Sequence, residues 1–169
     1  EDFFKATACW VDISEDQGLH WKKIGPLELP DRKFGVIEPA LFIDLQGHMR
    51  MLCRDRAYKI GGKGFIWEAI SQDGGLHWSD FRQTPLPNPD SGFDATHLRD
   101  GRIALVYNHS HTERFPLHLA LSLDGGDHWA EPLILSTVGE FPAVIQTADG
   151  LIHVTYAAPT GHSEQRRIK

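Results

Sequence analysis

The chain has 169 residues, of which 41% are hydrophobic and 24% are charged, as is typical of a folded globular protein. Its net charge of −6 argues against nucleic acid as a partner, and no apolar run has the length of a membrane span. The sequence shows no N-terminal signal pattern, and Cys9 and Cys53 imply no disulfide framework. We therefore expect each cysteine to be a small buried hydrophobe, and the cellular compartment stays open.

The first predicted elements are a strand over 5–13 and a second strand that begins at Trp21. The turn between them reads Ser14-x-Asp16-x-Gly18-x-x-Trp21. Ser and Asp side chains can bind the backbone amides of a turn, glycine adopts a positive φ readily, and tryptophan can pack under the turn. The same eight-residue pattern begins again at Ser71 and at Ser122, which gives steps of 57 and 51 residues. Three copies at this spacing indicate a repeat architecture.

A second repeated pattern consists of two apolar strands joined by a short turn at Gly47, Gly101 and Gly150. The first strand of each pair is predicted over 39–44, 95–98 and 143–147, and the second over 49–54, 102–108 and 151–157. A third strand follows over 65–70 and 118–121, and a fourth begins at each motif tryptophan. No segment shows helical periodicity, so the predicted fold is all-β.

Four consecutive strands of this kind have the length of one blade of a β-propeller. The sequence predicts a single propeller segment made of a half blade (1–30), two blades (36–86 and 90–136), a half blade (140–157) and a mobile polar tail (158–169). This is about three blade equivalents, roughly half of a six-bladed ring, and a closed ring needs at least about four blades. We expect a piece of a longer protein or, as the alternative, a homodimer that completes the ring.

The repeated motif is the turn that sialidases call the Asp-box, and three further segments carry the same resemblance. These are 86–94 (LPNPDSGFD), 100–109 (DGRIALVYNH) and 141–150 (FPAVIQTADG). The chain resembles the C-terminal half of the sialidase-like proteins, which are also described as BNR-repeat or predicted neuraminidase proteins. The resemblance implies a sialidase-type propeller, although one propeller fold serves many functions.

Strand order predicts which end of the blades binds a ligand. The Asp-boxes and the glycine turns lie at one end, and ligands usually bind at the other end, near the axis. Glu38 lies nine residues before its turn glycine and Arg54 seven residues after it, so we expect both at that end of one blade. The resemblance to sialidases implies that this arginine binds the substrate carboxylate and that this glutamate polarises a tyrosine nucleophile. An ion pair between neighbouring strands is the alternative.

The chain departs from the sialidase pattern at the nucleophile. The tyrosine implied by the resemblance falls at Phe141, which has no hydroxyl and is a candidate substrate-binding residue instead. Tyr156 is a candidate replacement for the nucleophile or else a core aromatic. Arg56 and Arg114 are candidates for further carboxylate-binding arginines, with solvated loop residues as the alternative. The general-acid aspartate of sialidases belongs to an earlier blade, so a retaining mechanism cannot be assembled from this chain alone.

Three more polar residues are expected at the ligand-binding end. Asp94 begins a predicted strand and is a candidate acid, base or acceptor for a sugar hydroxyl, or it shapes the turn. Asn108 and His109 follow the next strand pair and are candidate sugar ligands. His109 and His111 lack a third metal ligand, and no nucleotide-binding loop is present, so we expect neither a metal nor a cofactor.

The sequence therefore predicts a carbohydrate-binding protein and leaves its reaction open. The leading hypothesis is an exo-glycoside hydrolase of the sialidase type that acts on an acidic sugar such as sialic acid. The alternatives are a noncatalytic carbohydrate-binding or assembly module and a lyase that acts on uronic-acid polysaccharide. The missing tyrosine hydroxyl favours the noncatalytic alternative.

Overall fold

The computed structural model describes residues 7–29, 35–56, 61–158 and 163–168, the last of these by their backbone. Thirteen β-strands and no helix occupy these residues, so the described part contains no helix that could cross a membrane. All strand pairs within the sheets are antiparallel. The predicted all-β fold is confirmed.

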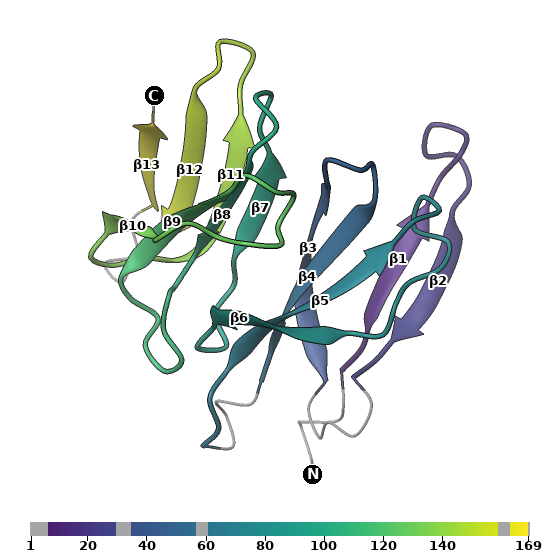
Figure 1. The fold of residues 1–169 in the computed structure, drawn as a ribbon, viewed down its shortest axis with the longest axis horizontal. Coiled ribbons are helices and arrows are strands. Elements are labelled where there is room, and N and C mark those ends of the chain that lie inside the picture. Colours follow the sequence, from purple (N-terminus) through teal and green to yellow (C-terminus); the bar gives the residue numbers. More distant parts are fainter. Residues whose placement is uncertain (1–6, 30–34, 57–60, 159–162, 169) are drawn as a thin grey trace.

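The strands form four sheets that follow one another in chain order across the molecule (Figure 1). The first sheet contains β1 (Cys9–Ile13) and β2 (Lys22–Leu27). The second contains β3 (Val36–Ile43), β4 (Met49–Asp55), β5 (Phe65–Ser71) and β6 (Arg82–Pro87). The third contains β7 (Asp94–His97), β8 (Ile103–Tyr107), β9 (Leu117–Ser122) and β10 (Leu133–Ser136). The fourth contains β11 (Glu140–Gln146), β12 (Ile152–Ala157) and β13 (Ser163–Ile168).

The last sheet differs from the expectation of a mobile tail over 158–169. Residues 163–168 form β13, which pairs with β12 from Ala157↔Ser163 to Ile152↔Ile168. The stretch SEQRRI has no alternation of apolar and polar residues, so its sequence gave no strand signal. Backbone hydrogen bonds to the free side of β12 place it in the sheet, and these bonds do not depend on side-chain type.

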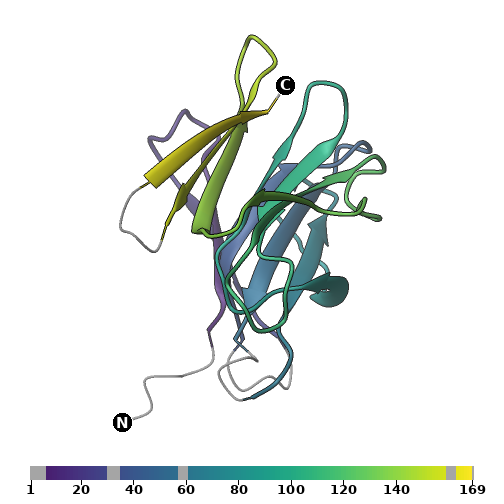
Figure 2. The same ribbon diagram turned by 90° about the vertical axis from the view of Figure 1, so that its left-hand side faces the viewer.

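The turns and the longer connections lie at opposite ends of the blades. In Figure 1 the turns β3–β4, β7–β8 and β11–β12 lie at the upper end, and the connection between β8 and β9 lies at the lower end. In the turned view of Figure 2, the turn between β11 and β12 again lies at the upper end. The two ends predicted from strand order are therefore present in the structure.

Each Asp-box closes its turn with the same hydrogen bonds. In the second copy, the Gly75 amide donates to Ser71 Oγ at 2.8 Å and the His77 amide donates to Asp73 Oδ1 at 2.9 Å. The Trp78 indole donates to the Gly75 carbonyl at 2.9 Å. The amide-to-serine and amide-to-aspartate bonds recur in the other two copies. The repeated residues thus hold the β1–β2, β5–β6 and β9–β10 turns.

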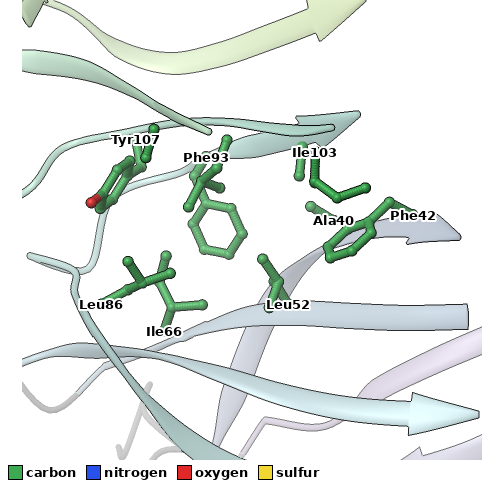
Figure 3. Close-up of a cluster of buried hydrophobic side chains, with 11 residues drawn as sticks. Ala40, Phe42, Leu52, Ile66, Leu86, Phe93, Ile103 and Tyr107 are labelled. Carbon is green, nitrogen blue, oxygen red and sulfur yellow. The ribbon is translucent and has the colours of Figure 1, made fainter. Parts of the chain in front are cut away.

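The hydrophobic core lies between successive sheets. Figure 3 shows the cluster between the second and third sheets, which includes Phe42, Leu52, Ile66, Phe93 and Ile103. Similar clusters fill the interfaces between the first and second sheets and between the third and fourth. All five residues of β8 are buried, because that strand has a neighbouring sheet on each face. Packing between sheets therefore sets the relative positions of the blades.

An ion-pair network centred on the buried Arg50 joins the second and third sheets at the turn end. Arg50 on β4 donates from Nε to Asp44 at 3.0 Å and from Nη1 to Glu68 at 2.9 Å. The same Nη1 donates to Asp127 Oδ1 at 2.8 Å, and Asp127 belongs to the Asp-box turn of the next sheet. Arg82 also binds Glu68, through its Nε at 2.6 Å. The network therefore links two blades at the end that carries the glycine turns. The other end, which carries the connection between β8 and β9, is hereafter called the loop-bearing end.

We predict that Ile66→Ala lowers the free energy of unfolding by about 2–5 kcal/mol, because Ile66 is fully buried between two sheets. The matched control is Ile145→Ala on β11, where the side chain is 58% exposed and the loss should stay near 0.5 kcal/mol. Urea denaturation of the three proteins measures both values. Equal losses would contradict a core located between the sheets.

Candidate functional site

Three residues that occupy equivalent positions in successive blades meet at the loop-bearing end. Glu38 lies in β3, Phe141 lies in β11, and Gly92 precedes β7. A Cβ atom built on Gly92 would lie 2.9 Å from Phe141 Cδ1 and 3.1 Å from Glu38 Oε2. The Glu38 carboxylate and the Phe141 ring therefore occupy the space that a side chain at position 92 would need.

The backbone here has an unusual conformation. Glu38 has a φ of 52°, Asp90 of 57° and Phe141 of 53°, and these are three of the four positive-φ non-glycine residues in the described part. The β3–β4 pairing shifts register between Ile37 and Ala40, and the β11–β12 pairing shifts between Glu140 and Ala143. Such bulges redirect side chains, and positive-φ residues of this kind cluster at functional sites.

Arg54 connects Glu38 to Asp90. It lies on β4 opposite Ile37, and its Nη2 donates to Glu38 Oε1 at 2.5 Å. Its Nη1 donates to the Asp90 carbonyl and lies 3.3 Å from Asp90 Oδ1. The Arg54 side chain is 7% exposed, against 45% for Glu38. The spacing predicted Glu38 and Arg54 side by side, and the structure places them in direct contact.

Arg114 extends this cluster from the connection between β8 and β9. Its Nη2 donates to the Asp90 carbonyl at 2.6 Å, and its Nη1 donates to Glu140 Oε2 at 3.0 Å. Its guanidinium carbon lies 5.9 Å from the centre of the Phe141 ring. Two arginines from different blades thus converge on one carbonyl, and the Arg114 side chain keeps 36% of its surface exposed.

The cluster of Glu38, Arg54, Asp90, Arg114, Glu140 and Phe141 is hereafter called the Arg54–Arg114 site. Sequence reasoning missed Asp90 and Glu140, because each belongs to a loop or strand start where polar residues are common. A positive φ at a non-glycine residue is the signal that distinguishes Asp90, and only coordinates show it. Arg56 follows β4 and is half-buried, beside residues that lie outside the described part.

Asp94 joins two blades. Its Oδ1 accepts from the Ala95 amide at 2.9 Å, and its Oδ2 accepts from the Val144 amide of β11 at 2.8 Å. Burial raises the pKa of this carboxyl above its ordinary value, and the two amide hydrogen bonds oppose that shift. The contacts give Asp94 a structural role between β7 and β11, and its use as an acid or base stays a prediction.

Two other candidates, Tyr156 and Asn108, are buried. Tyr156 is 2% exposed and belongs to the cluster between the third and fourth sheets, with its ring against Gly139. Asn108 is fully buried, and its Nδ2 donates to the carbonyls of Arg114 and Gly139, both at 3.0 Å. Both side chains are enclosed by neighbouring sheets, and their roles toward a substrate stay predictions. Their positions at the ends of predicted strands indicate the end of the blades at which they lie. These positions do not indicate whether a side chain packs between the sheets or faces solvent.

His109 lines a cavity outside the Arg54–Arg114 site. Its Nδ1 is 2.5 Å from the Tyr107 hydroxyl, and both residues line a cavity of about 300 Å³ with Leu86, Trp129 and Glu131. Burial lowers the pKa of the His109 imidazole, and burial together with the charge of Glu131 raises the pKa of the Tyr107 hydroxyl. None of the six residues of the Arg54–Arg114 site lines this cavity.

In the described part of the chain, no group of three or more His, Cys, Asp or Glu residues is arranged to hold a metal ion. The Arg54–Arg114 site instead combines two guanidinium groups with carboxylates. Each guanidinium is paired with carboxylates, Arg54 with Glu38 and Asp90 and Arg114 with Glu140.

Comparison with known families agrees with the repeat and the sheets. The model of the BNR repeat-like domain matches residues 2–154. The chain belongs to this family. No curated protein sequence gives a significant match.

Solved structures share the fold of this BNR repeat-like domain. The Hadza microbial sialidase Hz136 matches with a TM-score of 0.78 and 17% identity, over 99% of this chain and 39% of its own. A variant of the NanB sialidase from Streptococcus pneumoniae matches with a TM-score of 0.75 and 19% identity, over 92% of this chain and 25% of its own. The endo-arabinase from Bacteroides thetaiotaomicron matches with a TM-score of 0.61 and 16% identity, over 88% of this chain and 61% of its own.

These identities show a shared fold and leave the reaction open. The chain matches about two fifths of the first sialidase and a quarter of the second. The BNR repeat-like domain is therefore a sialidase-like propeller segment that contains two complete four-stranded blades among its described residues.

We predict that Arg54→Met lowers the free energy of unfolding by about 3 kcal/mol, because it removes the closer of the two arginines at the buried Asp90 carboxylate and leaves only Arg114, at 4.0 Å. Arg102→Met is the matched control: Arg102 pairs with Asp100 in an exposed turn, and its loss should cost about 0–1 kcal/mol. Urea denaturation at neutral pH measures both. A loss for Arg54→Met no larger than that for Arg102→Met would show that the Arg54 contacts do not hold the site together.

Proposed function

We propose that this BNR repeat-like domain supplies the carboxylate-binding side of a sialidase-like site, and that the complete protein is an exo-glycoside hydrolase for an acidic sugar. The observation that carries the proposal is the convergence of Arg54 and Arg114 on the Asp90 carbonyl. Arginines arranged in this way are typical of sites that bind a carboxylate through several N–H donors.

The exposure of the two arginines suggests a division of roles. Arg54 is almost enclosed and holds Glu38 and the Asp90 loop in position. Arg114 is more open, and a guanidinium has five N–H donors. Arg114 can therefore keep its bonds to Asp90 and Glu140 and also donate to the carboxylate of a sugar. The half-exposed Phe141 ring beside it offers an apolar surface for the sugar ring.

Catalysis needs groups that this site does not contain. In a retaining sialidase a nucleophile lies beside the glutamate, and the neighbour of Glu38 here is Phe141, which has no hydroxyl. We propose that the nucleophile and the general acid come from further blades, or from a second copy of this chain in a homodimer. Glu38 would then serve as the proton acceptor of the complete site.

Phe141 also supports a second candidate function, a noncatalytic carbohydrate-binding module. Such a module would use the same arginines and would bind an acidic sugar without hydrolysing it. Turnover separates the two functions, because both require the same binding. A lyase for uronic-acid polysaccharide would be recognised by the absorbance of its unsaturated product.

We predict that Arg114→Ala weakens the binding of N-acetylneuraminic acid by about 10–100-fold, the loss expected for a charge-assisted hydrogen bond. Isothermal titration calorimetry of the folded chain measures the dissociation constant. Arg102→Ala is the matched control, since its side chain is similarly exposed and is also paired with a carboxylate. That variant should bind as the wild type does.

The methyl ester of the same sugar tests whether the carboxylate is recognised, because the ester has the same ring without the charge. We expect the ester to bind more weakly and Arg114→Ala to leave its affinity unchanged. Equal binding of acid and ester, or no binding of the acid at millimolar concentration, would contradict the proposal. Release of a fluorescent aglycone from a sialoside, assayed with the complete protein, then distinguishes the hydrolase from the binding module.

A further inference from the structure

Two cysteines from different sheets are in contact. Cys9 lies on β1 of the first sheet and Cys53 on β4 of the second, 44 residues apart in the chain. Their Sγ atoms are 3.4 Å apart, and the residues are 4% and 0% exposed. The sequence predicts two small buried hydrophobes, and both are buried. Their contact could not be read from the spacing.

The strands direct both thiols into the same interface. In β1, Cys9 and Val11 are buried and the residues between and after them are not, so Cys9 faces the second sheet. Met51 and Cys53 of β4 belong to the same cluster as Cys9 and Val11. The described backbone contact between these sheets includes the bridge from Thr7 to Gly35. The thiol pair thus lies where the first sheet packs on its neighbour.

The distance is suitable for a covalent bond after a small movement. A disulfide has an S–S length of about 2.05 Å, so the two sulfurs must approach by a further ~1.4 Å. The two thiols also differ in reactivity. The hydrogen bond with Cys53 lowers the pKa of Cys9, whereas burial raises the pKa of Cys53. Cys9 is also the more accessible thiol, at 4% exposed against 0% for Cys53, so a small oxidant reaches it first.

We propose that Cys9 and Cys53 form a redox modification site, in which a peroxide converts the two thiols into a disulfide that joins β1 to β4. Cys9, as its thiolate, attacks one oxygen of the peroxide, the O–O bond breaks, and Cys9 becomes a sulfenic acid. Cys53 then gives up its proton and attacks the Cys9 sulfur, and the sulfenic oxygen leaves as water. For hydrogen peroxide, two thiols and one peroxide yield one disulfide and two molecules of water.

The site has a direct relation to the Arg54–Arg114 site, although it does not rest on the proposed function. Cys53 immediately precedes Arg54 on β4, and successive side chains of a strand point to opposite faces. The disulfide would therefore fix the backbone from which Arg54 reaches Glu38. It would also fasten the two-stranded first sheet, which pairs only β1 with β2 among the described residues.

The test treats the folded wild-type chain with hydrogen peroxide, quenches it, and unfolds it in iodoacetamide before mass spectrometry. We expect the protein to lose the mass of two hydrogen atoms, to take up no alkyl group at either cysteine, and to yield a linked peptide containing Cys9 and Cys53. Dithiothreitol should restore two alkylated cysteines. Alkylation of both cysteines after peroxide, or addition of oxygen to them without a link, would overturn the proposal.

Thermal unfolding provides an independent readout. The oxidised wild type should unfold about 5–15 °C above the reduced wild type, as expected for a disulfide in a chain of this size. Cys9→Ser should abolish that difference. Val11→Ala is the matched control on the same face of β1: it should lower both transitions and keep the difference between them. A linked protein that unfolds no later than the reduced one would count against a disulfide that stabilises this interface.

Discussion

The structure depends on one constraint, which is that each inner sheet must have both of its faces covered by neighbouring sheets. The five buried residues of β8 show this requirement, since a strand with a solvated face would alternate buried and exposed positions. The hydrophobic clusters accordingly lie between sheets. A blade of this kind is stable as part of a series, so the repeat in the sequence and the stacking of the sheets express the same physical requirement.

This packing produces the candidate site. Because successive sheets stack in the same orientation, equivalent positions of their inner strands come together at one end of the blades. Glu38, Gly92 and Phe141 occupy such positions, and their different side chains fit together because Gly92 leaves room for the other two. The repeat thus supplies three similar backbone positions, and the differences between the blades supply the chemistry. The bulges at Glu38 and Phe141 aim these side chains away from the regular strand direction.

Buried arginines join the blades at both ends. Arg50 is surrounded by carboxylates at the turn end and is 6% exposed, so it serves the scaffold. Arg54 is similarly enclosed at the loop-bearing end, and each of the two arginines has one half-exposed carboxylate partner, Asp127 for Arg50 and Glu38 for Arg54. Removing one partner from either network would be costly, because it would leave a buried charge unpaired. Both ends of the same pair of sheets are therefore joined through a buried arginine with carboxylate partners.

The sequence by itself determined the features that local chemistry controls. Ser71, Asp73 and Gly75 predict a turn because their hydrogen bonds and backbone freedom operate within a few residues. The spacing of Glu38 and Arg54 about one hairpin likewise predicts that they are neighbours on paired strands. Tertiary structure alone decided that Arg114 approaches Arg54, that Tyr156 is enclosed, and that Cys9 touches Cys53. These contacts join residues from different sheets, and the packing of one sheet on another depends on the shapes of many side chains together.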